Sequence, residues 1–291
     1  MTGSRRAAHL PLLLTILFAN YGCSPSEPTR EALYRAPSVE RVIDGVAFET
    51  GGWPPHLAAG DEGTSWGNHR AVIEVEPEDT SAGIVSVTIP WRRRDHDPDA
   101  KSVVVLDAAT GAPVANAVTV RVEPESGEIR FQPNEGSLRY HVYYMPWQST
   151  GGYYPTVTYP DLAPAPDPAW AREARNASPQ EVRAARTTHI QSVDDFHSFF
   201  PMEVIATKAE TARFMSDAPN GWRVVAEHRD RPIRMRHRIP QHWVDTSPFT
   251  SRVLRDEAFT LQLGVVAGDA PLEDLRVDFE GFPDEWVALW T

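Results

Sequence analysis

The sequence contains almost no cysteine, because Cys23 is the only one among 291 residues. A single cysteine cannot form a disulfide within the chain, and it excludes metal and redox sites built on cysteine pairs. The nucleotide-binding patterns GxGxxG and the P-loop are absent, and so is the zinc pattern HExxH. We therefore expect none of the nucleotide or zinc chemistry that these motifs support.

Basic residues are also scarce, since 28 Lys and Arg face 40 Asp and Glu, for a formal net charge of −12. An acidic chain is poorly suited to nucleic acid or to an anionic membrane surface, so we expect no nucleic-acid partner. Hydrophobic residues make up 41% and charged residues 23%, which excludes a disordered chain and a polytopic membrane protein. With 26 Pro, 18 Gly and only 5 Met, the composition predicts a turn-rich β protein of about two domains.

The N-terminus has the pattern of an export signal. Arg5 and Arg6 precede a short apolar run at 10–18, and Cys23 follows a glycine. This pattern resembles a bacterial lipoprotein signal, so we interpret 1–23 as a signal peptide with Cys23 as the lipidation site. The alternative is ordinary secretion with an unmodified cysteine. Either way we expect an exported protein: an outer-membrane or periplasmic lipoprotein that touches the membrane by its lipid anchor only, or a secreted protein.

The segment at 24–38 is polar and proline-broken, which is typical of a tether. After it, 39–159 alternates apolar and polar residues in short runs separated by Gly, Asn and Asp turns. This pattern predicts an antiparallel β-sandwich. The runs lie at 72–76, 84–89, 103–106, 118–122, 129–131 and 138–144.

A second module is predicted after a proline-rich linker and helix at 160–190, of which 160–168 is the linker itself. Ser178, Ser192 and Thr207 each begin a pattern of a helix N-terminus. Strand patterns follow at 222–226, 259–266 and 275–279. We therefore expect 191–291 to form a small α+β or second sandwich module that is incomplete.

Acidic residues offer one metal candidate and no catalytic pair. Asp95, Asp97 and Asp99 could supply oxygen ligands to a structural calcium ion, although the EF-hand pattern fails at its glycine and glutamate positions. The alternative is a solvated acidic turn that balances the arginines at 92–94. Adjacent acids occur at 61–62, 194–195, 256–257 and 284–285. Neighbours on a strand point to opposite faces, so we assign no catalytic residue.

Aromatic residues give the clearest binding signal. The chain has nine Trp, and aromatic planes stack on the apolar faces of sugar rings. We expect carbohydrate contacts at Trp66, His69, Trp91, Tyr144 and Trp147. The alternative is that these aromatics pack inside the sandwich or between domains.

Several segments in order resemble the N-terminal region of glycoside hydrolase family 123. They are WGNHRAVIEV at 66–75, IPWRRRD at 89–95, YYMPW at 143–147, FFPMEVIAT at 199–207, PIRM at 232–235 and RDEAFTLQLGVV at 255–266. The resemblance covers roughly 39–280. It implies a secreted carbohydrate-active protein related to β-N-acetylgalactosaminidases, with β-sandwich modules ahead of a catalytic (β/α)₈ barrel.

In that family an adjacent Asp-Glu pair of the barrel works with the acetamido group of the substrate. A barrel takes about 250 residues, and the sequence ends at Thr291, where the resemblance places its start. We therefore expect the non-catalytic sandwich portion of a protein that acts on N-acetylhexosamine glycans, with a C-terminal barrel as its partner. The alternative is a stand-alone surface lipoprotein that binds carbohydrate or protein without enzymatic activity.

Overall fold

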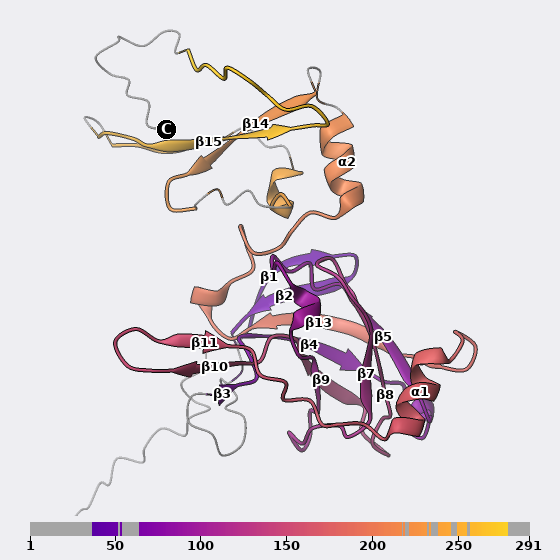
Figure 1. Cartoon of the computed structure of the whole chain (residues 1–291). Helices are drawn as coiled ribbons and strands as arrows, with labels where there is room; N and C mark the ends of the chain where they lie inside the picture. Colours follow the sequence, from indigo (N-terminus) through magenta and orange to yellow (C-terminus); the bar gives the residue numbers. More distant parts are fainter. Residues whose placement is uncertain are drawn as a thin grey trace, which may run out of the picture.

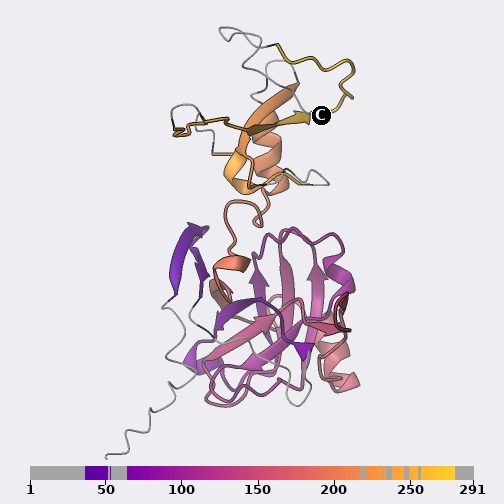
Figure 2. The same cartoon turned by 90° about the vertical axis from the view of Figure 1, so that its left-hand side faces the viewer.

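The computed structural model describes residues 37–51, 53, 64–216, 218, 221–231, 233, 238–245, 249–254 and 257–278. The described chain is mainly β, with several antiparallel sheets and two α-helices, so the predicted fold class is confirmed. Figures 1 and 2 show a larger part that ends near residue 200 and a smaller part that follows it. The predicted signal peptide, Cys23 and most of the predicted tether lie outside the described residues.

Two sheets face each other in the larger part (Figure 1). The six-stranded sheet has the order β1 (Ser38–Ile43), β2 (Val46–Thr50), β13 (Arg186–Ser192), β4 (His69–Glu74), β9 (Arg139–Tyr143) and β6 (Val104–Asp107). The four-stranded sheet has the order β12 (Arg183–Ala184), β5 (Val85–Ile89), β8 (Gly127–Phe131) and β7 (Ala117–Val122). Neighbours run antiparallel, except that β13 is parallel to β2 and β12 is parallel to β5.

One hydrophobic core fills the space between these sheets. The alternation along β5 points Val85, Val87 and Ile89 inward, and each is at most 1% exposed. Phe48 and Ile73 of the opposite sheet belong to the same buried cluster. Burying a side chain of this size stabilises the fold by about 1.5–3 kcal/mol, so this shared core holds the two sheets together as a sandwich.

The sandwich extends beyond the predicted end at residue 159. Strand β13 lies between β2 and β4, where Ile190 is opposite Phe48 on one side and Ala71 on the other. Ile190 is fully buried in the shared core. The proline-rich linker at 160–168 therefore connects two portions of one sandwich. The sequence placed the boundary there because proline clusters usually separate domains.

The first α-helix lies on the outside of the sandwich. Helix α1 (Pro168–Asn176) begins at Asp167, whose side chain accepts from the backbone N–H of Ala169 and Trp170. Ala171 and Ala174 pack against Ile84 and Val118. The helix predicted from Ser178 is absent: Glu181 accepts from the backbone N–H of Ser178 at 2.7 Å, but the chain turns there and continues into β12.

The smaller part packs one helix on a two-stranded sheet. Helix α2 (Lys208–Ser216) begins with the predicted capping box, in which Thr207 and Glu210 each accept from the backbone N–H of the other. Strands β14 (Trp222–His228) and β15 (Leu261–Ala267) pair along their whole length. Phe214, Trp243 and Val266 form the core of this part.

Two other predictions for residues 191–291 are corrected. The helix expected after Ser192 is only the 3₁₀ turn η4 (Asp195–His197), which Asp194 caps. The strand expected at 275–279 is not present in its described portion, 275–278. Leu275 and Val277 are exposed there, and no neighbouring strand pairs with them. In the part of the chain that the structure describes, no helix is long and apolar enough to cross a membrane.

Ion pairs join the two parts. The buried guanidinium of Arg92 donates to Glu210 of α2 and to Asp44 of the β1–β2 turn, at 2.9 Å in each case. Arg238 of the smaller part pairs with Glu125 of the sandwich. Because Arg92 and Glu210 are both largely buried, this joint has a defined geometry.

Candidate functional site

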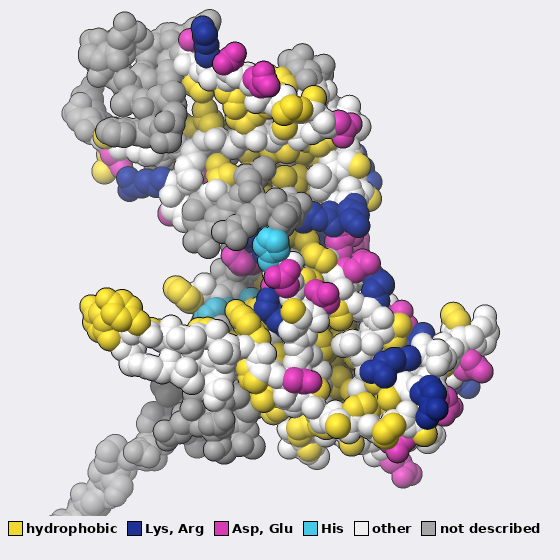
Figure 3. Space-filling view, viewed as in Figure 1, with side chains coloured by type: hydrophobic (Ala, Val, Ile, Leu, Met, Phe, Trp, Pro, Cys, Tyr) yellow, Lys and Arg dark blue, Asp and Glu magenta, His cyan; other side chains and the backbone are white. Residues whose placement is uncertain are grey.

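A hairpin with exposed aromatic residues projects from the sandwich. Strands β10 (Trp147–Thr150) and β11 (Thr156–Thr158) form it, and β3 (Thr64–Ser65) pairs with β10 at its base. Tyr153 is 90% exposed and Tyr154 is 85% exposed in the connecting loop. Figure 3 shows a knob of hydrophobic side chains at the hairpin tip. Large aromatics at a protruding tip mark a contact surface.

The two tyrosine rings pack edge to face and are otherwise largely exposed. Their ring centroids are 4.8 Å apart and the planes are at 89°. Gly151 precedes them at a φ of +92°, and a Cβ there would approach the Tyr154 carbonyl oxygen at 3.3 Å. The loop therefore favours glycine at this position, and its conformation turns the two rings away from the strands.

The hairpin and its approaches carry no charge. Residues 140–160 contain no Asp, Glu, Lys or Arg, in a chain of which 23% is charged. Hydroxyl and amide groups from Gln148, Ser149, Thr156 and Thr158 accompany the aromatic rings on the hairpin. An uncharged surface of aromatic planes and hydroxyl groups suits a neutral, polyhydroxylated ligand.

Trp66 and Trp147 lie at the base of this hairpin. Trp147 is opposite Ser65 in the strand pairing and is partly buried. Its indole N–H is buried without a hydrogen-bond partner among the described residues. Trp66 packs at 6.5 Å from the ring of Tyr143 and is also partly buried. These two of the predicted carbohydrate residues therefore lie at the base of the hairpin whose tip carries the exposed tyrosine pair.

Trp91 and Tyr144 are core residues. They are 1% and 2% exposed, and their rings lie 5.1 Å apart. The Trp91 ring lies directly over Gly127, and its indole N–H donates to the Glu123 carbonyl oxygen at 2.7 Å. Burial raises the pKa of the Tyr144 hydroxyl. Neither ring can stack on a glycan in this structure, because each is covered by the sandwich.

His69 is a packed, neutral histidine. Its ring is 4.7 Å from that of Phe199, and Nε2 is 2.9 Å from the His197 carbonyl oxygen. A carbonyl oxygen only accepts, so Nε2 must carry the proton. Burial lowers the pKa of His69 to about 4. His69 therefore connects β4 to the segment after β13, and its position does not indicate a glycan contact.

The three acids proposed for calcium are not brought together as a site. The carboxylate of Asp95 is paired with Arg93 and Lys101, whereas Asp97 and Asp99 are exposed. Burial raises the pKa of Asp95, but the two cations outweigh burial and hold that pKa below its ordinary value. Among the described residues, no three His, Cys, Asp or Glu side chains are placed to hold a metal ion.

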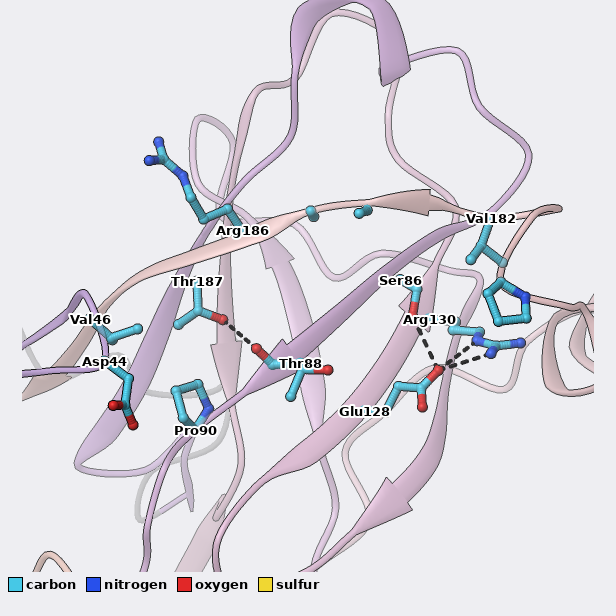
Figure 4. A pocket seen from close by; sticks show the side chains of 13 residues that line it. Asp44, Val46, Ser86, Thr88, Pro90, Glu128, Arg130, Val182, Arg186 and Thr187 are labelled. Carbon is cyan, nitrogen blue, oxygen red and sulfur yellow. Dashed lines mark hydrogen bonds and ion pairs between the residues drawn. The ribbon is translucent and has the colours of Figure 1, made fainter.

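A groove of about 550 Å³ crosses the outer face of the four-stranded sheet. Figure 4 shows Asp44 and Glu128, its two acids, at opposite ends. Arg130 donates to Glu128 at 2.9 Å, and Arg92 donates to Asp44 at 2.9 Å. None of the described residues that line the groove is aromatic. Both carboxylates already hold a cation, so the groove lacks a free pair of acids for glycoside chemistry.

A serine-hydrolase pattern was overlooked in the sequence. Residues 63–67 fit GxSxG, in which the serine stands on a sharp turn between a strand and a helix. Here Ser65 belongs to β3, is 5% exposed, and its hydroxyl accepts from the Gly67 backbone N–H at 3.1 Å. The chain continues into strand β4 and not into a helix. The pattern therefore carries no nucleophile role.

The sequence analysis also left the hairpin tyrosines out of the predicted site. Tyr153 and Tyr154 follow a Gly-Gly pair and precede Pro155. Glycine and proline of this kind mark a tight loop between strands. Aromatic residues inside such a loop are more exposed than aromatic residues within strands, which is the signal that could have identified them.

Comparison with known proteins agrees with this description. The family model of the glycoside hydrolase 123 N-terminal domain matches residues 62–193. No curated protein matches the chain, and no solved structure matches it. The matched span ends one residue after β13, so it agrees with the sandwich boundary found in the structure. Residues 62–193 are therefore similar to the N-terminal domain of glycoside hydrolase 123, which supports the resemblance of the sequence segments over that part of the chain.

Proposed function

We propose that this chain is the non-catalytic sandwich portion of an exported glycoside-hydrolase-like protein that acts on N-acetylhexosamine glycans. In this proposal the sandwich supports a catalytic domain and contacts the glycan with its aromatic hairpin. The family match at 62–193 supports the general class. The observation that carries the glycan contact is the exposed tyrosine pair on an uncharged hairpin.

The chemistry of the hairpin favours sugar over other ligands. A pyranose ring has an apolar C–H face and a rim of hydroxyl groups, which match tyrosine rings and neighbouring hydroxyl or amide groups. A phosphate or sulfate ligand needs a cation. Lys101, which lies over the ring of Tyr159 just after the hairpin, is already paired with Asp95. A neutral N-acetylhexosamine chain therefore fits the hairpin better than an anionic one.

The binding proposal is tested with residues 24–291 and neutral oligosaccharides that end in N-acetylgalactosamine or N-acetylglucosamine. We expect the double variant Tyr153→Ala/Tyr154→Ala to weaken binding at least tenfold in calorimetric titration. The matched control is Phe196→Ala, because Phe196 is also 90% exposed but lies in η4. Equal binding by the double variant and the parent, or an equal loss in the control, would contradict the hairpin as the site.

The non-catalytic role is tested with nitrophenyl N-acetylgalactosaminide and N-acetylglucosaminide. Groove acids that are held by arginines cannot serve as a proton donor and a nucleophile. We therefore expect no release of nitrophenol by the same protein. Turnover that disappears in Glu128→Gln would overturn this role and place chemistry in the groove.

The proposed membrane attachment depends on Cys23. The leader pattern supports lipidation, and several acyl chains hold a protein stably where one chain holds it only marginally. Mass spectrometry of the membrane fraction should show an acylated N-terminus at Cys23. A soluble mature protein with a free or removed cysteine would contradict the anchor.

A further inference from the structure

One buried arginine of the sandwich has no acidic partner. The arginines that are buried within the described chain are Arg70, Arg92, Arg93 and Arg130. Three of them form an ion pair with an acid: Arg92 with Glu210, Arg93 with Asp95, and Arg130 with Glu128. Arg70 is 8% exposed and forms no ion pair with a described acid. A buried charge without a counter-charge is costly, so its presence at this position needs an explanation.

The side chains that hold Arg70 are all neutral. Nε donates to the side-chain oxygen of Gln191 at 2.8 Å. Nη1 donates to the hydroxyl oxygen of Tyr143 and to Nδ1 of His141, both at 3.3 Å. Arginine only donates, so this nitrogen of His141 carries no proton and the ring is neutral. Burial lowers the pKa of Arg70, and the Tyr143 oxygen opposes that effect only in part.

One amino group of Arg70 reaches the solvent. Nη2 donates to no described residue, yet it is not one of the side-chain atoms that are buried without a partner. The rest of the guanidinium is fixed, because the ring of Trp53 lies 4.4 Å from its central carbon. That ring is itself held by a hydrogen bond from its indole N–H to the Ser192 carbonyl oxygen at 3.0 Å. The cation is therefore rigidly placed with Nη2 directed to solvent.

Gln191 keeps an acid of the same sheet away from Arg70. Strand pairing places Gln191 opposite Glu49 on one side and opposite Arg70 on the other. Its side-chain amide donates to Glu49 at 2.9 Å and accepts from Arg70. Glu49 is thus two strand spacings from Arg70, roughly 10 Å along the sheet. An anion can reach Arg70 without displacing an ion pair, but the nearby carboxylate disfavours a ligand with two negative charges.

Arg70 lies beside the base of the aromatic hairpin. It is opposite Tyr143, the last residue of β9, and the chain continues from there into the hairpin at Trp147. Trp147 is opposite Ser65, and the ring of the next residue, Trp66, lies 6.5 Å from that of Tyr143. The cation therefore adjoins the surface that we propose for glycan, although the hairpin itself is uncharged.

We propose that Arg70 binds a singly charged anionic group of a glycan, the carboxylate of a sugar acid or a sulfate ester, through Nη2. The anion supplies the counter-charge that the other buried arginines receive from an acid, in a charge-assisted hydrogen bond. The anion site follows from Arg70, whereas its attachment to a sugar rests on the proposed function. The matching ligand is a glycan that carries an acidic sugar beside the neutral N-acetylhexosamine units that contact the hairpin.

NMR titration of the full chain with galacturonate and galactose tests this site. The two sugars differ in a carboxylate against a hydroxymethyl group, and the indole N–H resonance of Trp53 reports binding beside Arg70. We expect galacturonate to bind roughly tenfold more tightly at low ionic strength. Arg70→Gln should abolish that preference. The matched control is Arg139→Gln, at an exposed arginine of the neighbouring strand β9. It should keep the preference.

A second variant covers the case in which Arg70→Gln does not fold. Glu49→Gln keeps Arg70 and removes the nearby negative charge, so galacturonate should bind roughly twofold more tightly. Galactose 6-sulfate separates the two anions: tight binding of it alone, lost in Arg70→Gln, supports the site and assigns it to a sulfate ester. Equal binding of all three sugars by the parent protein would overturn the proposal, and so would a preference that Arg70→Gln retains.

The hairpin variant separates this inference from the proposed function. Tyr153→Ala/Tyr154→Ala should lose neutral oligosaccharide but keep the preference for galacturonate, because Arg70 is untouched. If the parent binds galacturonate and no neutral oligosaccharide, the hairpin proposal fails and the anion site stands. If the parent binds neutral oligosaccharide through the tyrosines and does not distinguish galacturonate from galactose, only the Arg70 site is rejected.

Discussion

The two parts of this protein bury their sheets in different ways. In the sandwich, two sheets cover each other, and Ile73, Val85 and Phe131 are completely buried between them. In the smaller part, a single two-stranded sheet is covered by α2 and Trp243 on one side, and Leu263 on the other side is 44% exposed. The sandwich core is therefore covered on both sides by described residues, whereas one side of the β14–β15 sheet is left partly exposed.

The contacts between the two parts are polar, whereas the interior of each part is apolar. Arg92 pairs with Glu210 across it, and Arg41 donates to Asp245 and to Gln241 at 2.5 and 2.6 Å. Polar interfaces of this kind contribute less than a shared apolar core. The comparison indicates that each part has its own stability and that the joint is the weaker connection.

The largest predicted effect breaks the sandwich core and leaves the smaller part folded. Phe131→Ala should cost about 3–5 kcal/mol of unfolding free energy, because it removes a fully buried ring that packs 4.8 Å from Tyr140. Exchange of β8 amides in increasing denaturant measures this loss. Val266→Ala, in the core of the smaller part, should instead reduce the exchange protection of the β15 amides. A single common transition in both variants would show that the two parts unfold together.

The second prediction concerns acid and the sandwich alone. An unfolded histidine has a pKa near 6.5, and that of His69 is lowered to about 4 in the fold. The unfolded state therefore binds more protons between these pH values, and stability falls as the pH drops from 6.5 to 4. The full loss is about 3 kcal/mol at 1.36 kcal/mol per pH unit.

Unfolding midpoints measured from pH 7 to pH 4 check this prediction. His69→Gln should flatten the profile over that window. The control is His96→Gln, at an exposed histidine of the same sandwich. If the unfolding midpoint of His69→Gln falls with pH as steeply as that of the parent protein, His69 is not the cause of the loss of stability in acid.

The third prediction concerns the ion pair between Arg92 and Glu210, which joins the two parts. Burial raises the pKa of Glu210, but hydrogen bonds from Thr207 and Arg92 outweigh it and hold the pKa below its ordinary value. A lowered carboxylate pKa stabilises the fold at pH values above about 4.5, and this stabilisation is lost as the pH falls through the folded pKa. Glu210→Gln should cost about 1–2 kcal/mol at neutral pH.

Limited proteolysis at 193–207 reports on the joint. Cleavage should accelerate in Glu210→Gln at pH 7, and in the parent protein as the pH falls below the ordinary glutamate pKa and through the lowered pKa of Glu210. The sandwich amides of β5 and β8 should keep their protection in both cases. Loss of that protection would mean that the joint and the sandwich core are one cooperative unit.

The smallest effect is expected at the hairpin tip. Tyr153→Ala/Tyr154→Ala should change the stability of the sandwich by no more than about 0.5 kcal/mol, because both side chains are exposed. Thermal unfolding checks this expectation. A loss above 2 kcal/mol would assign the tyrosines a packing role and weaken the glycan proposal.

The sequence was sufficient for the fold class and for most strands. The runs at 84–89 and 129–131 became β5 and β8, because strict alternation places one side of each strand in the core. The capping box at Thr207 began a helix as predicted. The same pattern at Ser178 did not, because the residues after it pair with β5 as β12. Local capping signals indicate a turn, and tertiary pairing decides whether a helix follows.

The site was harder to predict because burial is a long-range property. Trp91 and Tyr144 have the same sequence appearance as exposed binding aromatics, yet the packing of distant strands covers both. Asp95 belongs to a run of acids, but Arg93 and Lys101 neutralise it. Which aromatics remain accessible depends on how β4, β9 and β13 assemble, and residue spacing alone does not contain that information.

The central position of β13 has a consequence for the order in which the protein can be built. Synthesis releases β2 and β4 long before Arg186–Ser192, so for more than a hundred residues of growth these two strands have no partner between them. Unpaired strand edges invite association with other chains. A nascent chain that stops before residue 192 presents such edges, and a chaperone that shields them until β13 arrives would raise the yield of folded sandwich.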